Sequence, residues 1–140
     1  MYHLPASVEN KVSDPAYTRE DRLAVAATLT RLGCHGSESF RTFYERHAGP
    51  FEGSRGFTLL DLLDQAENIV TQTEIARKEH GFLGRHLVIS NYIGNAVLVY
   101  DCELDFIFEV DFEGSDLALI AGTLEPRWES FEAFLVDFFS

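Results

Sequence analysis

Long apolar runs are the first feature that the sequence lacks. A membrane-spanning helix needs about twenty consecutive apolar residues, and the 140-residue chain contains no such stretch. Its beginning, "MYHLPASVENK", also lacks the apolar segment of a secretory signal peptide. The sequence therefore predicts a soluble, cytoplasmic protein.

Cysteine and the motifs of common catalytic or metal sites are also scarce. The two cysteines, Cys34 and Cys102, are far apart and form no CxxC pair, so the sequence predicts reduced, structural residues. A P-loop, a calcium-binding loop and the helical zinc spacing of histidines are absent. We therefore expect no catalytic residue, no cofactor and no metal. The one enzymatic alternative uses Cys34 or His35, but adjacent side chains diverge and make a poor nucleophile–base pair.

Basic side chains are few and unevenly placed. Residues 1–100 contain 12 acids and 10 bases, a net charge of −2, whereas residues 101–140 contain 11 acids and only Arg127, a net charge of −10. Such a surface repels phosphate backbones and anionic headgroups, so neither nucleic acid nor a membrane is an expected partner. The charge favours a basic protein partner, although surplus acid can also serve solubility alone.

The first half of the chain predicts helices behind an irregular beginning. Residues 1–17 contain Pro5 and Pro15 and predict an extended N-terminal arm, followed by a single domain over residues 18–140. Helical periodicity predicts one helix over residues 18–33, capped by Thr18, and a second over residues 37–48, capped by Ser37.

Residues 57–81 allow two alternatives. A helix could begin at Thr58, or Phe57–Leu62 could be a short strand followed by a helix after Asp64. Periodicity alone does not choose between them.

The second half predicts a sheet. "HLVIS" and "AVLVYD" are apolar on both faces, as in central strands, whereas "FIFEVDFE" alternates between apolar and largely acidic positions. "CELD" is placed to close a hairpin, and "EGSD" is placed to turn the chain into a last strand, "LALIAG".

The terminal stretch "RWESFEAFLVDFFS" predicts an amphipathic helix. At 100° per residue its large apolar side chains fall within an arc of roughly 140°: Trp128, Phe131, Phe134, Leu135, Phe138 and Phe139. Burying six such side chains contributes about 9–18 kcal/mol to folding, before the cost of lost conformational entropy is subtracted. The polar face carries acids, whereas a membrane-surface helix carries Lys and Arg there. We therefore expect this helix to cover the sheet.

The order of these segments resembles that of the SUKH superfamily, which includes fungal cell-wall-synthesis regulators of the Smi/Knr type and many bacterial proteins. The resemblance runs from about Leu23 to Phe139 and rests on "LTRLG", "SFRTFYERHAG", "FTLLDLLDQAENIV", "HLVISNYIGNAVLVYD", "FIFEVDFEG" and "SFEAFLVDFF". Two departures stand out: "ERHAG" lies where the family has an Asn-Gly pair, and "SNYIGNAV" has little of the family's glycine-rich strand entry.

The resemblance implies an α+β fold with a mostly antiparallel sheet, N-terminal helices and a C-terminal amphipathic helix packed on it. It also favours the alternative in which Phe57–Leu62 is a short strand. Bacterial members are thought to act largely as immunity proteins that neutralise toxins, and they have no catalytic residues to transfer. A regulatory or scaffold role of the fungal kind is the alternative.

The acids of the predicted hairpin are the candidate partner-binding residues. They follow the first strand of the hairpin, face outward from the second or lie just beyond it: Asp101, Glu103, Asp105, Glu109, Asp111, Glu113 and Asp116. We expect them to meet a basic surface, such as that of a nuclease toxin, and to set the rate and specificity of association.

Overall fold

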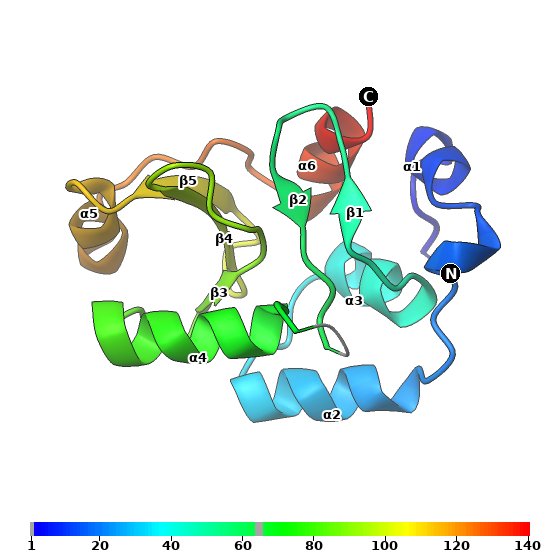
Figure 1. Ribbon diagram of the computed structural model, residues 1–140, viewed down its shortest axis with the longest axis horizontal. Helices are drawn as coiled ribbons and strands as arrows, with labels where there is room; N and C mark the ends of the chain where they lie inside the picture. The colour runs from blue at the N-terminus through cyan, green and yellow to red at the C-terminus, as the bar shows by residue number, and fades with distance from the viewer. Residues whose placement is uncertain (1, 64–65) are drawn as a thin grey trace.

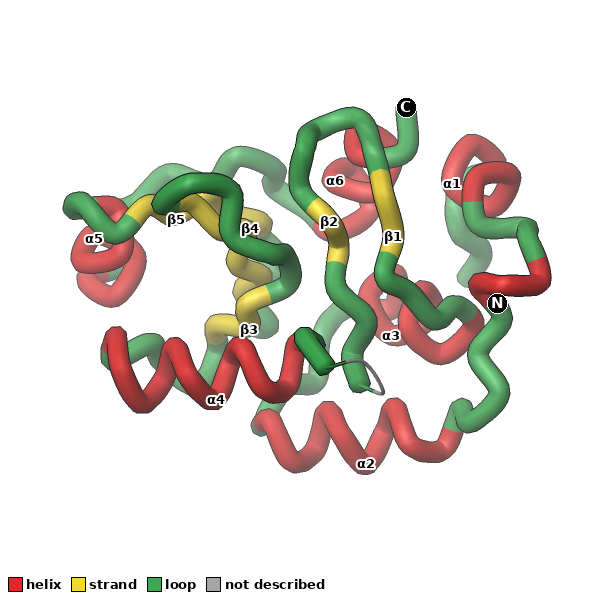
Figure 2. Tube along the Cα trace, viewed as in Figure 1, coloured by secondary structure: helices red, strands yellow, loops and turns green. Residues whose placement is uncertain are grey.

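Helices and short strands make up the computed structural model, which describes residues 2–63 and 66–140 (Figure 1). The helical elements are α1 (Ala6–Lys11), the 3₁₀ turn η1 (Pro15–Tyr17), α2 (Leu23–Leu32), α3 (Glu38–Arg46), α4 (Ile69–His80), α5 (Ser115–Ala121) and α6 (Phe131–Phe138). The strands are β1 (Phe51–Glu52), β2 (Thr58–Leu59), β3 (His86–Val88), β4 (Ala96–Asp101) and β5 (Ile107–Asp111). They form two antiparallel sheets (Figure 2), so the predicted α+β class is confirmed.

The larger sheet has the order β3–β4–β5 and places apolar residues opposite one another. Val88 lies opposite Val99, and Val97 lies opposite Val110. Strand β4 is fully buried from Val97 to Tyr100, as its two-sided apolar sequence predicts. The predicted hairpin is the β4–β5 pair.

The smaller sheet decides between the two alternatives for residues 57–81. Strand β2 pairs with β1, with Leu59 opposite Phe51, and helix α4 begins only at Ile69. The short strand is therefore the correct alternative, and the helix from Thr58 is wrong. Asp64, the predicted boundary, lies outside the described residues.

Two groups of buried side chains cover the two faces of β4. Leu98 and Tyr100 belong to a group shared with α3 and α6, whereas Val97 and Val99 belong to a group shared with α4 and α5. The C-terminal helix thus packs on the sheet, as predicted. The six apolar residues predicted for its inner face are buried, except Trp128, which precedes α6 and is half-buried.

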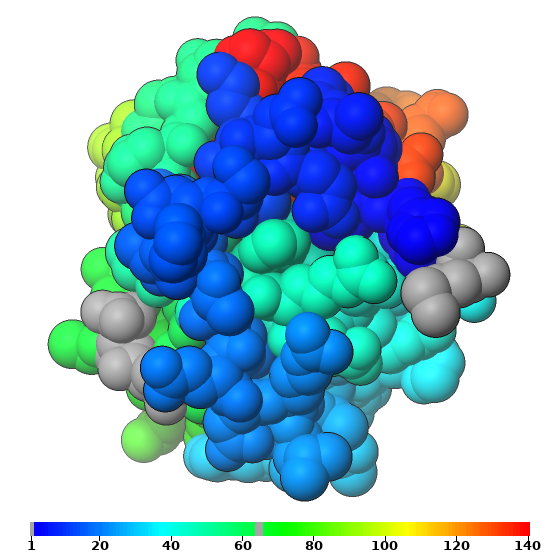
Figure 3. All heavy atoms as spheres, turned by 90° about the vertical axis from the view of Figure 1, so that its right-hand side faces the viewer, coloured from blue at the N-terminus to red at the C-terminus, as the bar shows by residue number. Residues whose placement is uncertain are grey.

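The N-terminal segment differs from the predicted extended arm. It forms α1 and η1, and it buries Leu4, Val8 and Val12 in the core. In Figure 3 this segment, in blue, lies across one face of the molecule and reaches the red C-terminal residues. A six-residue helix is marginal alone, so its stability comes from packing, which local periodicity does not reveal.

The segment "LALIAG" also differs from its prediction, because it forms helix α5 instead of a last strand. Leu119 is buried against the sheet, whereas Leu117 is 68% exposed. Gly122 ends the helix with φ 80°, a left-handed conformation that glycine adopts readily. A short apolar run is compatible with both structures, and here the terminal glycine favours the helix.

The start of α2 is later than predicted. Thr18 does not cap it but forms an isolated β-bridge with His47, while the Asp21 carboxylate accepts a hydrogen bond from the Ala24 N–H at 3.2 Å. The predicted end at Gly33 and the Ser37 cap of α3 are both confirmed.

Candidate partner-binding surface

The seven predicted acids follow the chain from the end of β4, through the β4–β5 turn and β5, to the start of α5. They are thus neighbours in the fold, but their surroundings divide them into structural and exposed groups.

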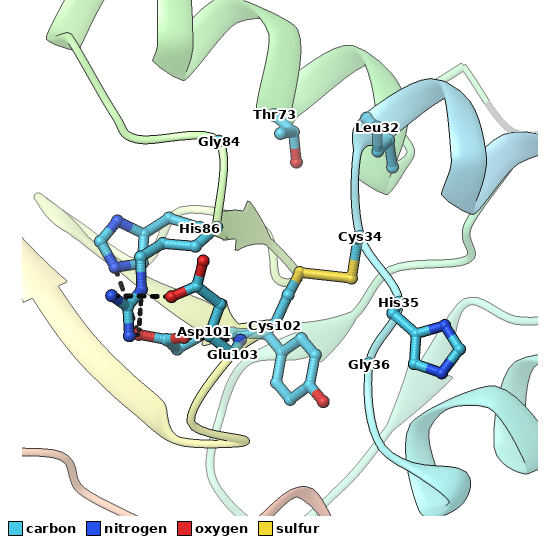
Figure 4. The surroundings of a disulfide bond; sticks show 12 residues. Leu32, Cys34, His35, Gly36, Thr73, Gly84, His86, Asp101, Cys102 and Glu103 are labelled. Carbon is cyan, nitrogen blue, oxygen red and sulfur yellow. Dashed lines mark hydrogen bonds and ion pairs between the residues drawn. A yellow bond between two sulfur atoms is a disulfide. The ribbon is translucent and has the colours of Figure 1, made fainter.

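Asp101 is a structural residue and does not present an outward charge as predicted. Its side chain is 3% exposed, and its Oδ2 lies 3.0 Å from the Arg85 guanidinium and 3.6 Å from His86 Nε2 (Figure 4). Its Oδ1 accepts hydrogen bonds from the N–H groups of Glu103 and Leu104, at 2.9 and 3.0 Å. The carboxylate therefore holds the β4–β5 turn closed, which is why an acid is needed there.

Asp105 is also largely structural. Its φ of 65° places it in the left-handed region, where Asp is one of the few residues tolerated. The carboxylate accepts hydrogen bonds from the Tyr100 hydroxyl at 2.7 Å and the Phe131 N–H at 3.3 Å. Burial and this hydrogen bond raise the pKa of Tyr100. Asp105 thus ties the turn to the start of α6.

Glu103 and Glu109 reach solvent, but each has an arginine beside it. The Glu103 side chain is 67% exposed and lies 3.0 Å from the Arg85 guanidinium. Glu109 is 42% exposed and pairs with Arg127, whose guanidinium also lies over the Trp128 ring. These pairs reduce the charge available to a partner without removing it.

The last three acids lie around the start of α5. Asp111 accepts hydrogen bonds from the Ser115 hydroxyl and the Glu113 N–H, which hold its pKa below the ordinary value. Asp116 accepts a bond from the Gly114 N–H at 3.3 Å. Glu113 is exposed and is the clearest outward acid of the predicted set.

Three further acids on the same third of the chain are not among the predicted residues, because they lie outside the hairpin. Glu125, Glu129 and Glu132 are exposed between α5 and α6 or on α6 itself. The amphipathic pattern of α6 already placed Glu129 and Glu132 on its polar face, and this signal could have identified them.

An apolar hollow of about 310 Å³ adjoins the turn. Its walls include Leu83 and Leu104, which are 40% and 53% exposed, and its polar side is formed by Arg85, His86 and Asp101. Burial lowers the pKa of His86, against the opposing effect of Asp101. The hollow was not predicted, because its walls come from segments far apart in the sequence.

The prediction of reduced cysteines is wrong. Cys34 and Cys102 form a disulfide between the α2–α3 connection and the β4–β5 turn, with their Cα atoms 5.6 Å apart (Figure 4). Cys34 therefore has no free thiol to act as a nucleophile in this state, and the His35 ring points away from the disulfide.

Within residues 2–63 and 66–140, no group of three or more His, Cys, Asp or Glu side chains could hold a metal ion. Every helix described there is too short or too polar to cross a bilayer.

No protein-family model and no curated protein matches the sequence.

Proposed function

We propose that this protein is a non-enzymatic binding module that neutralises a basic protein toxin. The observation that carries the proposal is the outward placement of carboxylates over the last forty residues, whose aromatic side chains are turned into the core. The exposed members are Glu103, Glu109, Glu113, Glu125, Glu129 and Glu132. An acidic surface of this kind accelerates encounter with a basic partner and disfavours acidic ones.

The partner surface in this proposal is smaller than the one predicted from the sequence. Asp101 and Asp105 maintain the turn, and the exposed acids supply the charge. The apolar hollow beside Leu104 supplies the site for an anchoring side chain of the partner, because affinity comes from a few buried anchors and charge mainly sets rate and specificity.

The resemblance to the SUKH superfamily supports the immunity role, since its bacterial members are thought to neutralise toxins. Excess negative charge supports a protein partner over nucleic acid or a membrane. A cytoplasmic location remains part of the proposal, and there the disulfide would meet a pool of reducing thiols.

Charge reversal tests the proposal. The protein and the product of the neighbouring gene would be studied by surface plasmon resonance as salt is raised. Glu113→Lys combined with Glu129→Lys should lower the association rate roughly tenfold at low salt, and the difference should shrink as salt screens the charges.

The matched control is Glu20→Lys, an exposed acid close to the start of α2 and remote from α5 (Figure 1). It should change the association rate little. Binding that is indifferent to salt, or equal losses in the two variants, would count against the proposed surface.

A further inference from the structure

The two cysteines of the disulfide differ in their exposure to solvent. Cys34 is 5% exposed and belongs to the main group of buried residues, whereas Cys102 is only partly buried at its edge. Cys102 also lines a hollow of about 470 Å³, together with residues that include His35, Gly84 and Arg85. A small reagent that enters this hollow therefore meets Cys102, whereas Cys34 is not among the lining residues.

The walls of this hollow are held in place by hydrogen bonds. The Arg77 guanidinium donates to the carbonyl oxygens of Leu32 and Gly84, at 2.9 and 2.7 Å, and so joins the end of α2 to the loop after α4. The Cys102 N–H donates to the Arg85 carbonyl at 2.8 Å. The hollow is thus a formed feature of the fold, and it is large enough to admit part of a small molecule.

The surroundings of Cys34 disfavour a negative charge on its sulfur. Cys34 directly follows Gly33, the residue that ends α2, and its N–H donates to the Leu29 carbonyl at 2.9 Å. The sulfur is therefore both buried and close to the negative end of a helix dipole. Once separated from Cys102, it is expected to remain protonated.

We propose that Cys102 is a thiol-exchange site for low-molecular-weight thiols. The thiolate of such a molecule attacks Cys102 Sγ and forms a new S–S bond with it. The Cys34–Cys102 bond breaks and its electron pair goes to Cys34 Sγ, which then takes up the proton that the incoming thiol has lost. Cys34 is a slow leaving group because its surroundings disfavour the thiolate, so access to Cys102 is what directs the attack. One thiol and one disulfide thus give one mixed disulfide and one thiol, without a further oxidant or reductant.

The asymmetry between the sulfurs makes the mixed disulfide persistent. A protonated, buried thiol is a weak nucleophile, so Cys34 returns slowly to displace the small molecule from Cys102. Modification at Cys102 also breaks the covalent link between the α2–α3 connection and the turn that carries Glu103.

Peptide mapping of the full chain tests this inference. The disulfide form is incubated with glutathione as the probe, quenched with acid, unfolded and alkylated, and each cysteine peptide is assigned by mass spectrometry. Glutathione is expected on Cys102 and the alkyl group on Cys34, with this arrangement exceeding the reverse by about tenfold. A reversed or even distribution, or the absence of any adduct at all glutathione concentrations, would overturn the proposal.

A second measurement compares the free thiols one at a time. In Cys34→Ser, Cys102 should react with a chromogenic disulfide reagent about a hundred times faster than Cys34 does in Cys102→Ser. Circular dichroism checks that both variants are folded, and if either is not, mapping of the unmodified sequence alone decides. Similar rates in folded variants would contradict the claimed difference in access.

Discussion

Replacing Asp61 with alanine is expected to remove a large part of the folding stability. Asp61 and Arg19 are 1% and 4% exposed and form a buried ion pair. The Asp61 carboxylate also accepts a hydrogen bond from the Gly49 N–H at 3.2 Å. Arg19 in turn donates to the carbonyl oxygens of Tyr44 and His47, so the pair joins the segment before α2 to α3 and to the residues after β2.

The magnitude follows from leaving one charge buried without its counterion. Removing one partner of a buried pair costs about 3–5 kcal/mol. Unfolding entropy is about 2.1 cal/mol/K per residue, or about 0.29 kcal/mol/K for 140 residues. A loss of about 4 kcal/mol therefore lowers the melting temperature by about 14 °C.

Urea denaturation followed by circular dichroism measures the loss, with thermal unfolding as a second measurement. Glu74→Ala is the matched control, because Glu74 forms an ion pair with Arg31 in which the side chains are 49% and 67% exposed. That change should cost less than about 1 kcal/mol. If Asp61→Ala costs no more than the control, the Arg19 charge is not held in a buried environment and the reasoning is refuted.

Two further predictions concern α6 and pH. Phe131→Ala should lower the free energy of unfolding by about 3–5 kcal/mol in urea titrations, because Phe131 is fully buried against Tyr100. Val136→Ala is the control: its site is 41% exposed, so the change should cost under about 1 kcal/mol. Equal losses would show that α6 does not cover the core. Because burial lowers the pKa of His86 below 6.5, the unfolded chain binds its proton more readily and stability should fall as pH drops through 6.5. In His86→Asn this fall, measured by urea titration from about pH 7.5 to 5.5, should be smaller, and an unchanged fall would contradict the assignment.

Helices with local caps and periodic apolar positions could be predicted from the sequence. Ser37 accepts a hydrogen bond from the Phe40 N–H, and Ser130 accepts one from the Ala133 N–H. Each capping side chain lies three residues from the N–H group that it satisfies. The start of each helix can therefore be predicted from its own local sequence. The burial of Phe134 also follows from helical periodicity alone.

Features that join distant segments could not be predicted in the same way. Cys34 and Cys102 are 68 positions apart, and nothing in their local sequences indicates that they meet. Asp101 is expected on the surface from its charge, but it lies beside Arg85, which precedes β3, and His86, the first residue of β3. Alternation along β5 predicts which residues face outward, but it does not predict which of them form an ion pair with an arginine.

The contact between α1 and α6 has a practical consequence for binding studies. Val8 and Val12, from the first twelve residues, share a core with Phe138 and Phe139. A synthetic peptide covering residues 128–140 would leave its rings without their cover and would self-associate in water. Fragments of the acidic third are thus poor substitutes for the whole protein, and chains shortened at the amino end should lose the shape of the opposite end as well.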